Sequence, residues 1–184
     1  MAPGDCQNAG HTAAECSKID QPPPMMFPNT GGKMCTSGTV AKVIDIVGMP
    51  GMPDYGKIWG AGIGLDLNNA GGIAVKMSLD AVAKGIKGIK FDLDMKPLAG
   101  LRVEAETTPT NGTEAGNDYW GATSSYPPSP VMVGTNTVLW SMFVGPKGHV
   151  FDPTKLLGIQ FHVPASTSGG GPYTFCISNV ALME

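Results

Sequence analysis

The sequence predicts an all-β protein built as an antiparallel β-sandwich. Residues 85–94 and 156–163 each alternate apolar and polar side chains, as do strands with one buried and one polar face. With 26 glycines and 16 prolines among its 184 residues, the chain favours many turns over long helices. The strand-like runs do not alternate with helical patterns, so a parallel βαβ arrangement is not indicated. Short strands separated by turns are typical of a sandwich.

The first strand is expected at residues 40–47, and a turn rich in glycine and proline follows at residues 48–54. Residues 78–84 are expected to form one helical turn, and residues 108–130 a long loop. The remaining strands are expected at residues 58–68, 73–77, 85–95, 101–107, 137–144, 156–163 and 173–183.

The chain divides into two parts. Residues 1–36 are expected to form an irregular Pro/Gly-rich N-terminal segment or linker, and residues 37–184 the β-sandwich domain. Residues 21–28 are rich in proline and predict an extended or polyproline-like conformation. Since linkers of this kind join modules, we expect the chain to be part of a larger secreted protein. The hydrophobic fraction of 42% is enough to fill one sizeable core.

Composition excludes some classes of partner. The net charge is -3, only 15% of residues are charged, and basic residues do not cluster, so a nucleic-acid partner is not expected. No run approaches the roughly 18 apolar residues of a membrane span. The first residues do not read as a signal peptide, and we expect the signal of an exported protein to have been removed from this chain.

The four cysteines lack the C-x-x-C spacing and companion histidines of a zinc site. Their even number suits an oxidising compartment and allows three connectivities. We favour Cys6 with Cys16, closing a short loop, and Cys35 with Cys176, joining the first core strand to the last. The alternative is that some of them are free buried thiols.

Six segments follow one another in a characteristic order, at residues 59–67, 88–93, 101–104, 117–121, 151–161 and 175–180. In this order, from about residue 38 to the end, the chain resembles the β-jelly-roll carbohydrate-binding modules and galactose-binding-like domains of secreted bacterial proteins. The resemblance implies a two-sheet jelly roll in which a concave sheet, or the loops at its edge, receives a saccharide. It implies no catalytic residues and no cofactor. The family usually has an aspartate where this chain has Asn179, which leaves any role of that acid open.

Many such folds also hold a structural calcium ion between the edges of the sheets. This sequence has no dedicated calcium loop, so calcium remains an alternative for which no ligands are named.

The first candidate sugar-binding residues lie on the polar faces of the expected strands. Sugar hydroxyls are bound by planar groups that donate or accept two hydrogen bonds at once. These candidates come together if their strands are neighbours with aligned polar faces, and we expect Lys90 and Asp92 to lie beside Gln160 and His162. The alternative for Arg102, which is next to Glu104 and Glu106, is a solvated cross-strand charge pattern. The candidates are Asp66, Asp92, Arg102, Glu104, Gln160 and His162.

Aromatic residues of the long loop supply the second group, because the C–H faces of sugars stack on aromatic rings. Asp118, Tyr119, Trp120 and Tyr126 are the candidates there, and a loop tryptophan must either fold back on the core or contact a ligand. The alternation around Trp59 predicts a core position. Trp140 fits either face of its strand.

The leading hypothesis is a secreted, non-catalytic polysaccharide- or oligosaccharide-binding module that tethers an attached enzyme or a cell surface to glycan. The alternatives are a polysaccharide-active lyase or hydrolase on a β-sandwich and an adhesion or structural domain. Glu104 and Glu106 would lie about 7 Å apart on one strand, a distance compatible with a glycosidase pair. They would lie side by side, however, whereas the mechanism needs acids that flank a bond. A G-x-S-x-G elbow is also missing.

Overall fold

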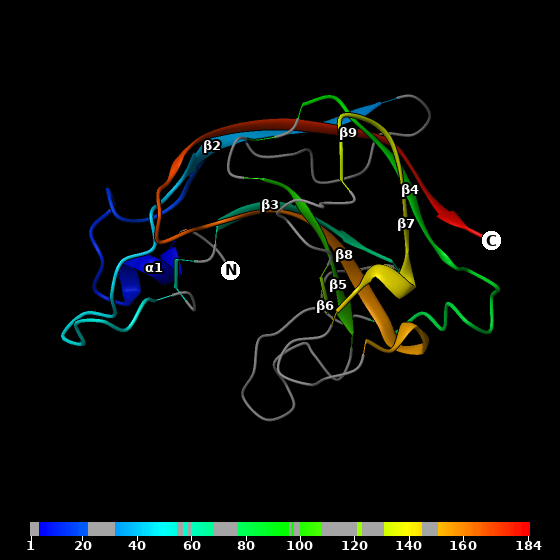
Figure 1. Ribbon diagram of the computed structural model, residues 1–184, viewed down its shortest axis with the longest axis horizontal. Helices are drawn as coiled ribbons and strands as arrows, with labels where there is room; N and C mark the ends of the chain where they lie inside the picture. Colours follow the sequence, from blue (N-terminus) through cyan, green and yellow to red (C-terminus); the bar gives the residue numbers. More distant parts are fainter. Residues whose placement is uncertain are drawn as a thin grey trace.

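The computed structural model describes residues 4–21, 32–54, 57–58, 60–67, 77–95, 97, 100–107, 121–122, 131–144 and 151–184. Its strands form two antiparallel sheets, with strand orders β1-β2-β9-β4-β7 and β3-β8-β5-β6. Both sheets curve in the same direction, and the four-stranded sheet lies on the inner side of the curve (Figure 1). We therefore call the five-stranded sheet the outer sheet and the four-stranded sheet the inner sheet. The expected all-β sandwich is confirmed.

Most strands have bounds close to those predicted from the sequence. The outer sheet consists of β1 (Lys18–Gln21), β2 (Lys33–Val40), β4 (Gly88–Leu93), β7 (Gly134–Leu139) and β9 (Gly171–Met183). The inner sheet consists of β3 (Gly60–Asp66), β5 (Arg102–Thr107), β6 (Gly121–Ala122) and β8 (Leu156–Pro164). The helical elements are α1 (Gly4–Asn8) and the 3-10 turns η2 (Trp140–Met142) and η4 (Pro153–Lys155). In the described part of the chain, no helix has the length and apolar character needed to cross a membrane.

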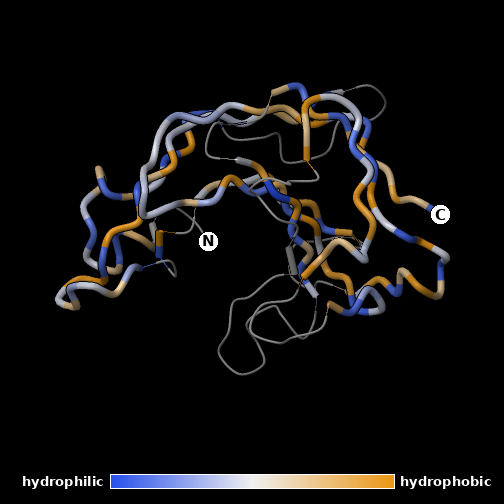
Figure 2. Tube along the Cα trace, viewed as in Figure 1, coloured by the Kyte–Doolittle hydropathy of each residue, from blue (hydrophilic) through white to orange (hydrophobic). Residues whose placement is uncertain are grey.

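Apolar side chains from the facing surfaces of the two sheets fill the core. Phe91 of β4 and Phe161 of β8 are fully buried and meet edge to face, with ring centroids 4.7 Å apart, so their contact joins the two sheets. Burying a side chain of this size stabilises the fold by about 1.5–3 kcal/mol. Because side chains alternate along a strand, this packing turns the polar residues of each strand away from the core. Figure 2 shows the alternation as changes of hydropathy along the strands.

The first strand and the helical turn differ from the prediction. β2 begins at Lys33 rather than at residue 40 and pairs with β9 along its whole length. After Val40 the chain makes isolated bridges instead, such as Lys42 with Ser166. One inward position of β2 is the buried polar residue Thr36, which hides the apolar alternation of this strand. The helical turn predicted near residue 80 is a non-helical turn.

The strand predicted at residues 137–144 is shorter than expected. β7 stops at Leu139, and Trp140 opens η2 in a buried position. Its indole Nε1–H donates to the carbonyl of Ile86 at 3.0 Å, and its ring lies beside those of Phe143 and Phe151. Trp140, whose orientation the sequence left open, is therefore a core residue.

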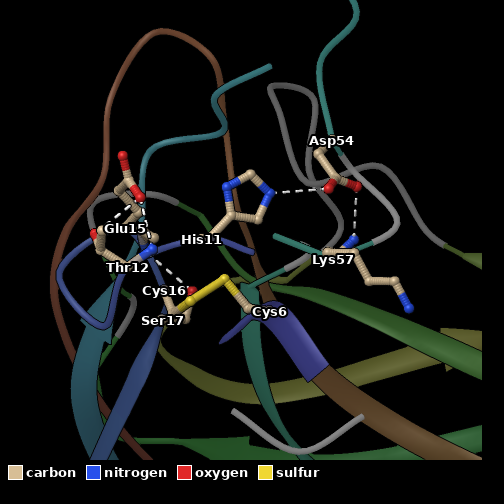
Figure 3. Close-up of a disulfide and its surroundings, with 9 residues drawn as sticks. Cys6, His11, Thr12, Glu15, Cys16, Ser17, Asp54 and Lys57 are labelled. Atoms are coloured by element: carbon tan, nitrogen blue, oxygen red, sulfur yellow. Dashed lines mark hydrogen bonds and ion pairs between the residues drawn. A yellow bond between two sulfur atoms is a disulfide. The ribbon is translucent and has the colours of Figure 1, made fainter. Parts of the chain in front are cut away.

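The N-terminal segment is closed on itself by a disulfide between Cys6 and Cys16 (Figure 3). It is attached to the rest of the protein by side-chain and strand contacts. His11 Nε2 lies 2.9 Å from Asp54 Oδ2, with both residues buried. β1 adds an edge strand next to β2. Residues 1–36, expected to be irregular, thus contribute α1, β1 and the first part of β2.

The second disulfide joins Cys35 of β2 to Cys176 of β9, which stand directly opposite each other in the outer sheet. Both expected pairings are therefore present, and no cysteine is free. The two cysteines lie 141 positions apart in the sequence. In the chain-entropy model, closing a loop of this length stabilises the fold by about 5 kcal/mol.

Candidate binding face

The surface of the inner sheet that points away from the core carries polar side chains from three neighbouring strands. β8 lies between β3 and β5, so polar residues on β8 have neighbours on both sides. We call this surface the inner face. It brings together five of the residues that the sequence singled out: Asp66, Arg102, Glu104, Gln160 and His162.

Three of these residues form a compact hydrogen-bonded group, which we call the inner cluster: Arg102, Glu104 and His162. Arg102 stands opposite His162 in the pairing of β5 with β8. Glu104 Oε1 lies 2.8 Å from His162 Nδ1 and 2.5 Å from Arg102 Nη2. Glu104 and His162 are buried, at 6% and 3% exposure, whereas the side chain of Arg102 is 32% exposed. Two donors thus converge on one buried acceptor, and solvent reaches the cluster at Arg102.

The contacts of the inner cluster indicate which ring nitrogen of His162 carries the proton. Arg102 Nη2 and Nε also lie 3.1 Å and 3.3 Å from His162 Nδ1. An arginine N–H can only donate, and Nδ1 cannot accept from it while donating to Glu104. Since a carboxylate is the stronger acceptor and the contact to it is shorter, we assign the proton to Nδ1 and the hydrogen bonds of both donors to Glu104.

Glu104 is held in its ionised form. Burial raises the pKa of this carboxyl group, but the attraction and hydrogen bond of His162, followed by those of Arg102, outweigh burial and leave the pKa below its ordinary value. An ionised Glu104 in turn fixes the positions of both donors.

Two glycines of β3 make room for the polar side chains of β8. A Cβ atom on Gly60 would lie 2.8 Å from His162 Nε2, and the φ of Gly60 is 127°, which disfavours other residues. A Cβ atom on Gly62 would lie 2.6 Å from the carbonyl oxygen of Phe161. The two glycines therefore allow β3 to approach β8 closely. Sequence reasoning missed their role, although the alternation of glycines at 60, 62 and 64 was visible.

Gly64 differs from these two glycines. A Cβ atom at this position would meet no atom of the described residues within 4 Å. Gly64 is exposed and stands opposite half-buried Gln160, and exposed Asp66 follows on the same face. Together with Arg102, these residues make up a part of the inner face that solvent reaches. Amide, carboxylate and guanidinium groups there can exchange hydrogen bonds with hydroxyl groups.

Glu106 continues the polar row of β5 beyond Glu104 and is also buried. In the sequence it was considered as part of a charge pattern with Arg102 and Glu104 and as half of a glycosidase pair, but not as a binding residue. The alternation along the strand that indicated Arg102 and Glu104 also places Glu106 on the inner face.

Asp92 lies apart from the other candidates. It sits on the exposed face of the outer sheet, where it accepts hydrogen bonds from Thr135 Oγ1 at 2.6 Å and Asn179 Nδ2 at 2.7 Å. These hydrogen bonds, that of Thr135 first, lower the pKa of Asp92. The expectation that Lys90 and Asp92 lie beside Gln160 is wrong, because β4 and β8 belong to different sheets whose polar faces point in opposite directions.

The remaining candidates cannot be placed. Asp118, Tyr119, Trp120 and Tyr126 lie outside the described residues, as does Trp59. Within the part of the chain that is described, no group of three or more His, Cys, Asp or Glu side chains could hold a metal ion.

No protein-family model matches the chain, and no curated protein matches it either.

Proposed function

We propose that the protein is a non-catalytic carbohydrate-binding module whose inner face receives a glycan. The observation that carries the proposal is the inner cluster. Glu104, itself held by His162, fixes the guanidinium of Arg102, whose side chain is 32% exposed. A guanidinium held in this way presents a planar set of donors to neighbouring hydroxyl groups, and little side-chain freedom is lost on binding.

Other groups on the same face complement this donor. Gln160 supplies an amide and Asp66 a carboxylate, which accepts hydrogen bonds from hydroxyl groups. The inner sheet also lies on the inner side of the curved sandwich, which suits an elongated ligand (Figure 1). Tyr119 and Trp120 are the proposed stacking residues, because aromatic rings bind the C–H faces of sugars.

Binding of this kind acts by raising the local concentration of whatever is attached to the module. A few hydrogen-bonding and stacking contacts give millimolar to micromolar affinity, which avidity increases when modules are linked. Two disulfides and no free cysteine fit a secreted protein, because disulfides persist in oxidising compartments. We propose that an enzyme or a cell surface is thereby tethered to polysaccharide.

The test is electrophoresis in native gels cast with soluble glucan, xylan or mannan. We expect at least one of these glycans to retard the protein, and the variant Gly64→Leu to lose that retardation. A Cβ atom at Gly64 would meet no atom of the described residues within 4 Å, so the variant should fold while covering the part of the inner face beside Gln160. Arg102→Ala should weaken binding as well.

The matched control is Thr137→Leu, which adds the same side chain to an exposed position of β7 on the outer sheet. It should bind like the wild type. Equal retardation of Gly64→Leu and wild type would place the site elsewhere than the inner face. Release of reducing ends or unsaturated products from the same polymers would instead identify an enzyme.

A further inference from the structure

We propose that the disulfide between Cys35 and Cys176, the outer-sheet disulfide, is a site of reversible thiol–disulfide exchange. Thiols in solution open it while the protein stays folded. The disulfide between Cys6 and Cys16, the N-terminal disulfide, stays closed under the same conditions. Because the exchange site lies in the outer sheet, it does not depend on glycan binding by the inner face.

Solvent access differs between the two disulfides. Cys35 and Cys176 are partly exposed, and the residues before and after each of them in its strand are buried, so both cysteines point away from the core. By contrast, Cys6 and Cys16 are only 3% and 5% exposed. A thiolate must reach a sulfur atom to attack it, so it can attack the outer-sheet disulfide directly, whereas the N-terminal disulfide must first be uncovered.

The strands joined by the outer-sheet disulfide are also held together without it. β2 pairs with β9 over all 8 of its residues. Met34 and Phe175 lie next to the cysteines in these strands, point the opposite way and are buried in the core. Breaking the disulfide therefore leaves the strand pairing and the core in place. The two cysteines remain at facing positions, where their sulfur atoms can pair again.

The exchange takes place in two steps. A thiolate from solution attacks one sulfur atom of the outer-sheet disulfide and forms a mixed disulfide with that cysteine, while the other cysteine leaves as a thiolate and takes up a proton. A second thiolate attacks the mixed disulfide and releases the first cysteine, which is also protonated. Two solution thiols are thereby oxidised to one disulfide, and that disulfide reverses both steps.

The test uses the folded wild-type protein and reduced glutathione as the solution thiol. Free thiols are trapped with iodoacetamide at intervals and assigned by mass spectrometry after cleavage at lysine, which separates the two pairs because Cys6 and Cys16 both precede Lys18. We expect the outer-sheet disulfide to open at least about tenfold faster than the N-terminal disulfide, because only the latter requires prior opening of the fold. The circular dichroism spectrum should stay native, and oxidised glutathione should restore the disulfide.

Urea below the unfolding transition separates exchange in the folded state from exchange that follows opening. Opening exposes surface, and urea promotes it for that reason. We expect urea to accelerate opening of the N-terminal disulfide and to leave the rate at the outer-sheet disulfide unchanged. The matched variant is Cys6→Ser/Cys16→Ser, in which the outer-sheet disulfide should react at the wild-type rate.

Equal rates at the two disulfides, or faster opening of the N-terminal disulfide, would overturn the proposal. A rate at the outer-sheet disulfide that rises with urea, or loss of the native spectrum on its reduction, would overturn it as well. Should the serine variant fail to fold, the wild-type rates with and without urea decide the question alone. All of these rates are measured without glycan, so their outcome is separate from that of the proposed function.

Discussion

Glu104 and Asp92 are two carboxylates on opposite sides of the sandwich, and each accepts hydrogen bonds from two side chains. Both have a pKa below the ordinary value. Glu104 is buried and its donors belong to a histidine and an arginine. Asp92 lies half-buried at the surface of the outer sheet, and its donors are the uncharged side chains of Thr135 and Asn179.

The difference lies in what water can do for each group. A buried carboxylate loses its hydration, so it stays ionised only where opposite charges or several hydrogen-bond donors replace the water. A carboxylate at the surface keeps part of its hydration, so the neutral donors of Asp92 suffice to lower its pKa. The pKa is therefore lowered at both sites, but replacing Glu104 should destabilise the protein much more than replacing Asp92.

Removal of Glu104 should have the largest effect. In Glu104→Ala, His162 loses the acceptor of its buried Nδ1–H and Arg102 loses its partner. Breaking a buried pair by removing one member typically costs 3–5 kcal/mol. Because Arg102 can turn towards solvent, we expect about 3 kcal/mol, measured by urea unfolding followed by fluorescence. Stability equal to that of the wild type would show that Glu104 is not a structural anchor.

Protonation of Glu104 at low pH should destabilise the protein by an intermediate amount. The pKa of Glu104 is lowered on folding, so the unfolded state binds the proton more tightly. Its contribution to stability is complete above the unfolded-state pKa of about 4.5 and is lost as the pH falls through the lower folded-state value. We expect wild-type stability to fall more steeply than that of Glu104→Gln between about pH 5 and about pH 3. Parallel curves of unfolding free energy against pH would contradict this assignment.

Substitution of Asp92 should have the smallest effect. Asp92→Asn retains an acceptor for Thr135 or Asn179 at a position where water replaces whatever is lost. We expect the midpoint of urea unfolding to be indistinguishable from that of the wild type. A midpoint lowered as far as in Glu104→Ala would contradict the expected difference between the two carboxylates.

The strands were largely predictable because alternation is a local property. The alternation of apolar and polar side chains predicted the segments that form β4, β5, β8 and β9. The inward residues of these strands are buried. β2 was misplaced because Thr36 occupies one of its inward positions. Burial of a threonine depends on partners elsewhere in the fold, and alternation cannot report it.

The candidate site was only partly predictable for a related reason. Alternation indicates which residues share a face of one strand, but strand order decides which faces meet. Arg102, Glu104 and His162 were correctly grouped because β5 and β8 are neighbours. Asp92 was wrongly joined to Gln160 because nothing local to β4 reveals that it pairs with β7 and β9.

The disulfide between Cys35 and Cys176 also has a mechanical consequence. The strands of the inner sheet, and therefore the entire inner face, lie in the stretch of chain that this bond closes. Tension applied to the segments outside the two cysteines would pass through the covalent bond and would not extend the residues between them. In the proposed tether, the inner face would therefore stay folded under load while the outer segments stretch.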